Sequence, residues 1–298
     1  MESKIINLFS KGDTVYIRNN PCKVLKVGKP ISPVGEPKTD LYLLLENKNE
    51  LFELKISLKN INASFVENKI TAQRAYILFG KKLKTILKQS IAQLVNEFNS
   101  RKLIFKSSFG KSKEGSFTLG WRFDLVWQHE GKLSGSILLS KEQKLEVYTG
   151  ENLPSEKKDC FVNSKKIKNF GVANCILISD WQTIKTAEDV FANLLIFDES
   201  MVNALPDIYF SCKALNYRSL LTDRPILKRI EGNRSLAVYV NWIILNNKLH
   251  PELIFDDPLE IKGTEVLENL LQNLQLLNIE TIYDINRNNV SSVNYIQD

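Results

Sequence analysis

The sequence predicts a mixed α/β (α+β) fold carried by one continuous chain without a clear linker. Three observations point to this class. Short runs of alternating apolar and polar residues fill residues 14–58 and predict strands. Apolar residues recur every three or four positions over 81–98 and 265–277, which is the period of a helix with one buried face. Strand-like runs return between residues 102 and 150, separated by turns rich in glycine and serine.

The N-terminal region is predicted to form a small sheet. Its strands are expected at residues 14–17, 22–29, 40–46 and 51–58. A loop at 29–37 separates the second strand from the third, because three prolines prevent regular structure there. The third and fourth strands are joined by the polar turn Asn47-Lys48-Asn49-Glu50.

The rest of the chain is predicted to mix helices and strands. Helices are expected at 70–79, 81–98, 187–195 and 265–277, with Gly80 separating the first two. Strands are expected at 103–106, 116–127, 132–139, 145–148 and 175–179. The pattern at 206–215 and 235–242 fits either type.

The composition excludes several classes of site. No stretch is long and apolar enough to span a bilayer, and no secretory signal is visible, so a cytoplasmic protein is expected. The four cysteines are scattered without a C-x-x-C pair, which argues against a zinc knuckle or a disulfide framework. With only two histidines in the chain, catalysis is expected to depend on carboxylates and lysines.

Charge is distributed unevenly along the chain. Residues 1–150 carry a net charge of +11, whereas residues 251–298 carry −7. A basic N-terminal half suits a polyanion such as nucleic acid, although lysine-rich surfaces are also common without one. The acidic C-terminal segment is expected to pack on the body of the protein or on a second subunit.

The third and fourth strands are predicted to have one apolar and one polar face. Because alternate side chains of a strand point to opposite faces, one face gathers apolar residues from both strands and is expected to be core. These residues are Leu41, Leu43, Leu45, Phe52, Leu54, Ile56 and Leu58. An antiparallel hairpin places Asp40, Glu53 and Lys55 together on the opposite face.

Two carboxylates and an amine suit the hydrolysis of a phosphodiester. Carboxylate oxygens are ligands that Mg²⁺ prefers, and the cation stabilises charge on the phosphate and acidifies water. Asp40 and Glu53 are the expected ligands, helped by the backbone carbonyl of Leu54. Lys55 is expected to orient or deprotonate the attacking water, or to neutralise the transition state.

The register of this hairpin decides how close the carboxylates come. A turn centred at 48–49 pairs Asp40 with Ser57 and leaves it about 13 Å beyond the partner of Glu53. A tighter turn at 46–47 would place the two acids opposite each other, and a bend or bulge would also close the gap. Otherwise the polar face is a solvated surface with an ordinary Glu–Lys pair.

Two motifs in this region resemble a known family. Gly35-Glu36-Pro37-Lys38-Thr39-Asp40, followed by Glu53-Leu54-Lys55, looks like the PD-(D/E)xK nuclease superfamily. It is closest to type II restriction endonucleases whose first motif reads Gly-x-Pro-Lys-Thr-Asp. The resemblance covers roughly residues 29–80. It implies a restriction-endonuclease-like central mixed sheet flanked by helices, in which Asp40 and Glu53 bind Mg²⁺ and Lys55 serves the water.

The same resemblance suggests auxiliary residues. Gln73 is similar to the glutamine of a Gln-x-x-x-Tyr element that approaches the active site, although Tyr76 comes one residue early. An exposed residue at a helix start is the alternative for Gln73. Many members also place a glutamate on an early helix, and only Glu2 could fill that role here. Because the segment before Asp40 is short, that ligand is either missing or supplied from elsewhere. Lys38, beside the expected metal site, is a candidate for holding a phosphate oxygen.

Candidate DNA contacts lie in two segments. Lys59, Asn60, Asn62 and Ser64 follow the fourth strand and offer donors for phosphates and base edges. Lys106, Lys111, Lys113 and Arg122 lie in a region rich in glycine, serine and aromatic residues. That region would enter a DNA groove, or its aromatic residues would belong to the core.

The sequence therefore predicts a Mg²⁺-dependent endonuclease acting on double-stranded DNA, of the type II restriction class, with a cognate methyltransferase encoded nearby. The alternatives are a phage, mobile-element or repair nuclease of the same superfamily, and a DNA-binding protein without catalysis. A homodimer is expected, since DNA sites are often two-fold, and no membrane partner is expected. The nuclease core is expected at 1–180, with a β-rich DNA-contacting insertion at about 101–150, and residues 181–298 are expected to serve recognition or dimerisation.

Overall fold

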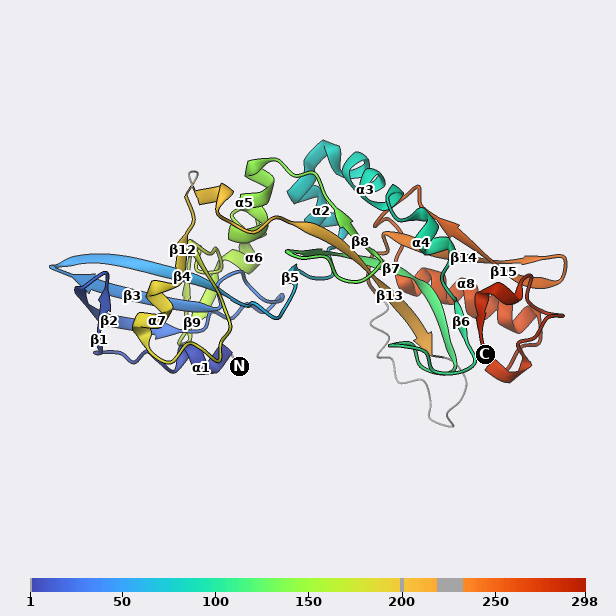
Figure 1. The fold of residues 1–298 in the computed structure, drawn as a ribbon, viewed down its shortest axis with the longest axis horizontal. Helices are drawn as coiled ribbons and strands as arrows, with labels where there is room; N and C mark the ends of the chain where they lie inside the picture. Colours follow the sequence, from blue (N-terminus) through green and yellow to red (C-terminus); the bar gives the residue numbers. More distant parts are fainter. Residues whose placement is uncertain (1, 199–200, 219–232) are drawn as a thin grey trace. The chain divides into compact units, whose positions relative to one another are not determined.

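The computed structural model describes residues 2–198, 201–218 and 233–298, and the chain is mixed α/β as predicted (Figure 1). It divides into two compact units, each built from two segments of the chain. Unit 1 comprises Met1–Ser64 and Leu139–Asp207, and unit 2 comprises Phe65–Leu138 and Ile208–Asp298. This division differs from the expected boundary at residue 180, because the chain leaves unit 1 and returns to it before that point.

Unit 1 contains a mixed sheet of six strands in the order β1-β2-β3-β4-β11-β12. The strands are β1 (Thr14–Ile17), β2 (Asn20–Gly28), β3 (Leu41–Asn47), β4 (Glu50–Asn60), β11 (Cys175–Ser179) and β12 (Leu194–Ile196). The first four form antiparallel pairs in chain order, as the alternating pattern predicted. Strand β11 then lies parallel to β4, and β12 lies antiparallel to β11.

One face of this sheet forms the main core of unit 1. The predicted apolar face of β3 and β4 is buried there, apart from Phe52, which is partly buried. Residues of α1 (Glu2–Ile6) and α7 (Ala187–Ala192) complete this core, among them Ile5 and Val190. The short helix α1 is therefore anchored to the sheet, which fixes the position of the neighbouring Glu2.

The opposite face is not solvated throughout, contrary to expectation. Tyr42 and Leu44 of β3 pack against a second hairpin formed by β9 (Cys160–Val162) and β10 (Lys165–Ile167). The Phe170 ring stacks on the Tyr42 ring with centroids 4.1 Å apart. The sequence pattern missed this cover because it lies more than 100 residues along the chain.

The prediction of a strand at 145–148 is wrong, because this segment belongs to helix α5 (Lys141–Thr149). Ser140 and Gln143 form a capping box at its start, and Gly150 ends it with a φ of 73°. The signals for both helix ends are thus present in the sequence. The short helix α6 (Ser155–Lys158) follows.

Unit 2 is built around the long strand β7 (Ser116–Val126), the central strand of an eight-stranded sheet. It pairs with β13 (Tyr209–Arg218) along its whole length and with β14 (Val238–Leu245) near its middle. The other strands are β5 (Phe65–Glu67), β6 (Ile104–Phe105), β8 (Ser134–Ser136), β15 (Lys248–Ile254) and β16 (Ile296–Gln297). The ambiguous segments 206–215 and 235–242 therefore fall largely in strands.

Gly120 permits the contact between β7 and β14. A Cβ at this position would lie 2.4 Å from the carbonyl oxygen of Val238, and its φ is +154°. The register of β13 against β7 shifts at the same place. A glycine is thus required where a bulged strand meets a second backbone.

The helices of unit 2 are α2 (Ala72–Phe79), α3 (Leu83–Ala92), α4 (Val95–Asn99) and α8 (Gly263–Leu276), with a 3-10 turn, η1 (Gly80–Lys82), between α2 and α3. The single helix expected at 81–98 is interrupted at residues 93–94. Three further 3-10 turns are η2 (Met201–Asn203) in unit 1, and η3 (Ile282–Asp284) and η4 (Val293–Tyr295) in unit 2. The acidic C-terminal segment packs on its own unit, since β16 pairs with β6.

All four cysteines are free and buried. Burial raises the pKa of the Cys160 thiol to about 11 and that of Cys175 to about 12, so both stay protonated near neutral pH. None of the helices that the structure describes combines the length and apolar character needed to cross a membrane.

Candidate active site

Asp40 is held at the entrance to β3 by two hydrogen bonds. Its backbone N–H donates to the carbonyl oxygen of Ile56 at 2.9 Å. Its Oδ2 accepts a hydrogen bond from the backbone N–H of Leu58 at 2.8 Å. The carboxylate is therefore fixed against the outgoing end of β4, and its residue is only partly exposed.

Three charged groups act on the Asp40 carboxylate. The pKa of Asp40 is raised to about 6, mainly by burial and to a smaller extent by the nearby charge of Glu2. The ammonium groups of Lys59 and Lys29 act in the opposite direction, and Lys59 has the larger effect. Lys29 also donates a hydrogen bond to Oε2 of Glu2, which raises the pKa of Lys29. We call Glu2, Lys29, Asp40 and Lys59 the Asp40 cluster.

The register of β3 and β4 explains why Lys59 belongs to this cluster. Asn47 pairs with Glu50 across a two-residue turn at 48–49, so continuing the pairing places Asp40 opposite Ser57. Lys59, two residues beyond Ser57, has its side chain on the same face of β4. Counting outward from the turn was enough to predict this pairing, because no bulge interrupts β3 and β4.

The same register separates Asp40 from Glu53. The partner of Glu53 is Leu44, four residues beyond Asp40, which corresponds to about 13 Å along the strand. Neither the tighter turn nor the bulge that would close this gap is present. The structure therefore does not bring together the two carboxylates that were expected to bind one cation.

Glu53 is instead part of a separate cluster. Its Oε1 accepts a hydrogen bond from the hydroxyl of Tyr42 at 2.7 Å. The ammonium of Lys26 lies over the rings of Tyr42 and Phe170, at 5.9 and 5.6 Å from their centroids. Burial lowers the pKa of Lys26, and the charge of Glu53 partly opposes that shift. Glu53 thus has a local role as acceptor and counter-charge.

Lys55 is also engaged locally. Its Nζ donates to the carbonyl oxygen of Asn169 at 3.4 Å. Its backbone N–H donates to Oδ1 of Asn174 at 2.7 Å, and Nδ2 of Asn174 donates to the carbonyl of Glu53 at 2.9 Å. Asn174 therefore holds β4 at this point, and Lys55 contacts a neighbouring loop.

The donor set of the Asp40 cluster fits a magnesium ion. Mg²⁺ is usually held by one or two carboxylates while it keeps several waters. Glu2 and Asp40 supply two carboxylates, and the charge of Glu2 raises the pKa of Asp40. Within residues 2–198, 201–218 and 233–298, no group of three or more His, Cys, Asp or Glu side chains is placed to hold a metal. A site here would therefore depend on water or substrate oxygens for its remaining ligands.

Lys38 does not serve as a free phosphate contact. Its Nζ donates to the carbonyl oxygen of Val147 at 2.7 Å, in the last turn of α5. A cation at that end of a helix is favoured by the unpaired carbonyls and by the helix dipole. The Lys-Thr part of the first motif thus contributes to packing, with Thr39 fully buried.

The other predicted contacts after β4 differ in accessibility. Oδ1 of Asn60 accepts a hydrogen bond from the backbone N–H of Asn62 at 2.9 Å, which forms a local turn. Asn62 is exposed, whereas Ser64 is buried and does not face solvent as a DNA contact would. Only Lys59 of this group belongs to the Asp40 cluster.

The remaining candidates lie in unit 2. Gln73 is exposed at the start of α2 and is not part of the cluster, which is built within unit 1. Nζ of Lys106 donates to the carbonyl of Ile285 at 3.0 Å. Lys111 and Arg122 line a pocket, and Lys113 is exposed outside it.

Comparison with known proteins gives no match to a protein family, to a curated protein or to a solved structure.

Proposed function

We propose that this chain is a magnesium-dependent DNA endonuclease whose active site is the Asp40 cluster. One observation carries this proposal. The partly buried carboxylate of Asp40 lies near a second carboxylate and two lysines at one end of a rigid hairpin. A carboxylate that burial keeps near a pKa of 6 is poorly stabilised without a cation, so it favours binding one. Its position next to lysines favours a phosphate substrate.

The roles follow from this placement. Asp40 and Glu2 would hold Mg²⁺, which when bound supplies a Lewis acid that stabilises charge on the phosphate. Lys59 lies close enough to Asp40 to influence its pKa and is the residue assigned to orient the attacking water. Lys29 holds Glu2 in place through their ion pair. Glu53 and Lys55 are assigned supporting roles in the hairpin.

The fold agrees with this proposal at a coarse level. The resemblance of the Pro-Lys-Thr-Asp motif implied a central mixed sheet flanked by helices, and unit 1 has a mixed sheet with helices of its own. The expected products are 5′-phosphate and 3′-hydroxyl ends from double-stranded DNA. A type II restriction enzyme is the preferred class, with a homodimer and a methyltransferase encoded nearby. A phage, mobile-element or repair nuclease would use the same site.

Supercoiled plasmid incubated with the full chain and Mg²⁺ tests the activity. We expect nicked or linear product with Mg²⁺ and none with EDTA. A mobility shift without any cleavage, across a range of plasmid sequences, would instead favour a DNA-binding protein without catalysis. Asp40→Asn is expected to abolish cleavage while keeping the hydrogen bond from Leu58, because an amide oxygen also accepts.

Two lysines on the same strand distinguish this site from the one expected from sequence. Lys59→Ala is expected to lower the cleavage rate at least about 100-fold, the range typical of a positioned proton-transfer group. Lys55→Ala removes the same charge four residues away and is expected to change the rate less than threefold. If Lys55→Ala lowered the cleavage rate more than Lys59→Ala, then Glu53 and Lys55 would be the catalytic residues and Lys59 would not.

Cation binding can be followed without cleavage. Thermal unfolding of the full chain at pH 7.5 is expected to shift upward when Mg²⁺ is added, because a ligand of the folded state stabilises it. Glu2→Gln and Asp40→Asn are expected to lose this shift, whereas Glu53→Gln is expected to keep it. A shift that disappears in Glu53→Gln alone would place the cation at the other carboxylate.

A further inference from the structure

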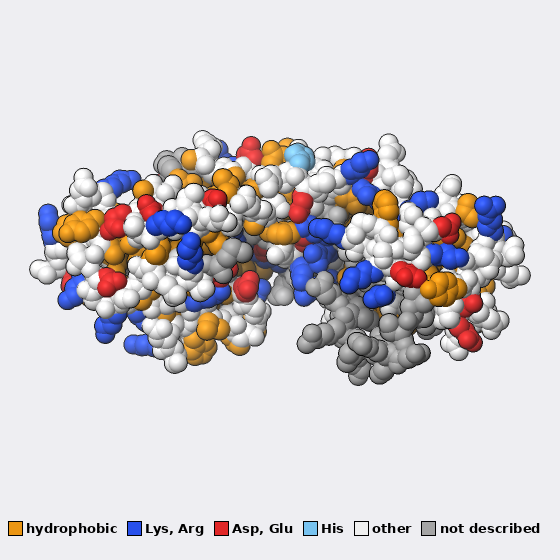
Figure 2. Space-filling view, turned by 60° about the horizontal axis from the view of Figure 1, so that its bottom comes forward, with side chains coloured by type: hydrophobic (Ala, Val, Ile, Leu, Met, Phe, Trp, Pro, Cys, Tyr) orange, Lys and Arg blue, Asp and Glu red, His pale blue; other side chains and the backbone are white. Residues whose placement is uncertain are grey.

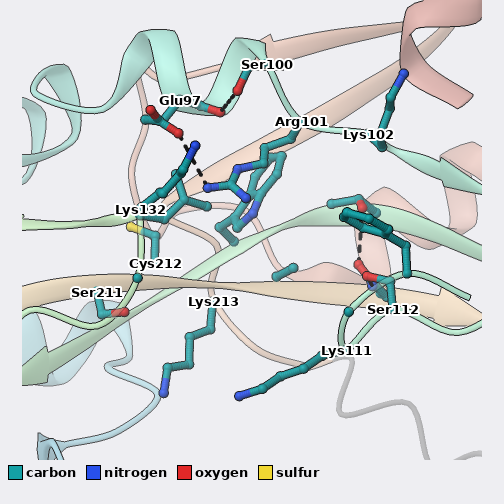
Figure 3. A pocket seen from close by; sticks show the side chains of 18 of the residues that line it. Glu97, Ser100, Arg101, Lys102, Lys111, Ser112, Lys132, Ser211, Cys212 and Lys213 are labelled. Carbon is teal, nitrogen blue, oxygen red and sulfur yellow. Dashed lines mark hydrogen bonds and ion pairs between the residues drawn. The ribbon is translucent and has the colours of Figure 1, made fainter. Parts of the chain in front are cut away.

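Unit 2 contains a large pocket whose floor is the β7–β13 pair (Figure 3). Its volume is about 1130 Å³. Trp121 of β7 and Cys212 of β13 contribute to the floor. Figure 3 shows charged side chains reaching this space from separate segments, including the end of α4, the loop before β7 and the loop before β8.

The lining of the pocket is strongly basic. Six cationic side chains contribute to it: Arg101, Lys102, Lys111, Arg122, Lys132 and Lys213. Two carboxylates, those of Glu97 and Glu130, also line the pocket. Figure 2 shows Lys and Arg side chains gathered close together on the drawn face of the molecule. An excess of positive charge in a concave site concentrates anionic ligands.

Both carboxylates already have cationic partners. Oε2 of Glu130 lies 2.8 Å from Nζ of Lys213, and Oε2 of Glu97 lies 3.6 Å from Nη2 of Arg101. By contrast, three lysine side chains make no hydrogen bond or ion pair with any residue that the structure describes: Lys102, Lys111 and Lys132. The positive charge of the pocket is therefore only partly compensated by its own acids.

The sheet register adds a second indication. Lys213 of β13 is the direct partner of Arg122 on β7. Like charges directly opposite each other on neighbouring strands are destabilising. Arg122 has an ion-pair contact with the buried Asp124 at 3.6 Å, and Lys213 has Glu130, but two cations side by side remain a cost to folding. A bound polyanion would offset it.

Size and chemistry indicate a polymer. The pocket exceeds the 300–1,000 Å³ typical of small-ligand sites. Its cations lie on several different segments, which suits a chain of successive phosphates better than one phosphate. Phe109, 62% exposed, is the first residue of the turn that also carries Lys111. An exposed aromatic ring beside cations is typical of sites where a base stacks.

The turn is fastened in this position. Phe109 and Ser112 exchange two backbone hydrogen bonds of 2.9 and 3.0 Å around Gly110 and Lys111. Nδ2 of Asn216 on β13 donates to Oγ of Ser112 at 2.9 Å. Lys111 and Phe109 are thus presented at the pocket by an anchored turn.

We propose that the pocket of unit 2 binds the sugar–phosphate backbone of a DNA strand, with Lys111 and Lys132 contacting phosphates and Phe109 offering a stacking surface. This site deepens the proposed nuclease function, on which its choice of DNA rests, and it gives unit 2 a substrate-holding role. The Asp40 cluster in unit 1 supplies the chemistry.

The test measures binding of a labelled DNA duplex with a single-stranded overhang, whose unpaired bases are free to stack, to the full wild-type chain in EDTA, where cleavage does not interfere. The double variant Lys111→Ala/Lys132→Ala is expected to bind about tenfold more weakly at 100 mM salt. The slope of log K against log salt is expected to fall by about 1 to 2, since each lost phosphate contact removes about one. Phe109→Ala is expected to weaken binding with no change in slope.

A matched control separates the pocket from overall charge. Lys81→Ala/Lys82→Ala removes two exposed lysines of η1 in the same unit and is expected to change affinity less than twofold. Equal losses in both double variants would overturn the proposal, because only net charge would then matter. Displacement of the duplex by a millimolar deoxynucleoside monophosphate would also overturn it, because the pocket would then be a site for a free nucleotide.

Failure of this site and failure of the nuclease function give different results. If wild-type protein cuts plasmid and the pocket variant binds and cuts equally well, the pocket proposal fails alone. If wild-type protein never cuts but its DNA binding depends on Lys111 and Lys132, the nuclease function fails and the pocket stands as a DNA site.

Discussion

At the scale of single residues, the energetics centre on Asp40. Its carboxyl group is partly withdrawn from water, and burial raises its pKa to about 6 from an ordinary value near 3.8. The folded state therefore binds a proton more tightly than the unfolded state between these two values. The stabilisation from that proton is complete below pH 3.8 and is lost as the pH rises through 6.

This linkage predicts a pH-dependent effect of Asp40→Asn. Asparagine keeps the shape and the acceptor but never ionises, so the variant should gain stability relative to the wild type between pH 4 and pH 7. We expect a gain on the order of 1 kcal/mol, because partial exposure reduces the full effect. Urea unfolding of both proteins at several pH values in EDTA measures it.

A constant difference between the two proteins across this range would contradict the raised pKa. Glu53→Gln makes the same carboxylate-to-amide change at an exposed position of the same hairpin and is the matched control.

How far the sequence could predict the site is visible in these same residues. Asp40 and the face it shares with Ser57 and Lys59 follow from alternation and from counting outward from the turn at 48–49. The resemblance to the nuclease motif favoured Glu53 and Lys55, although the count places Ser57 and Lys59 nearer to Asp40. Glu2 and Lys29 come near Asp40 only because of how α1 and the loop after β2 pack on the sheet. No local sequence pattern encodes this packing.

At the scale of elements, α5 shows how local chemistry outweighs strand-like composition. The run Leu145–Tyr148 contains the valine and tyrosine that favour strands. The capping box at Ser140 and the left-handed Gly150 fix the helix at both ends instead. The helix then presents the carbonyl of Val147 to Lys38, two residues before Asp40 in the chain.

The cap of α5 can be tested directly. Ser140→Ala removes the acceptor for the backbone N–H of Gln143, so we expect a loss of about 1 kcal/mol in the free energy of unfolding. Ser140→Thr keeps a capping hydroxyl and is expected to lose much less. Chemical denaturation monitored by circular dichroism gives both values, and equal losses would show that the cap contributes nothing specific.

The elements that were easiest to predict share one property. Strands β1 and β11 match their expected bounds, and β7 is one residue shorter than expected, because turn residues bound each apolar run. The break in the helix at 93–94 was not predictable, since the apolar stripe continues through it. The cover of β3 by the β9–β10 hairpin was missed for a similar reason, since it requires tertiary contact.

At the scale of the whole molecule, the division into units could not be read from the chain in order. Unit 1 needs β11 to flank β4, and these strands are more than 100 residues apart. Unit 2 needs β13 and β14, both after residue 208, to flank β7. Pairings between such distant strands leave no local pattern in the sequence. The expected boundary near residue 180 therefore differs from the division into units.

This arrangement predicts that residues 1–180 do not fold as a stable piece. Such a fragment would carry β7 without its two main partners, leaving the buried side chains of that strand exposed. We expect aggregation or a non-cooperative urea transition, compared with a cooperative transition for the full chain. A soluble fragment with a sharp transition and dispersed amide resonances would contradict the division.

The chain crosses between its two units three times, near residues 64, 138 and 207. These crossings affect how the protein responds to proteolysis. A protease that cuts a single crossing leaves the units covalently joined through the other two. Nicked protein should therefore run as fragments on a denaturing gel yet elute as one species from a sizing column. Separating unit 1 from unit 2 would take three cuts, because three strands of polypeptide connect them in place of a single linker.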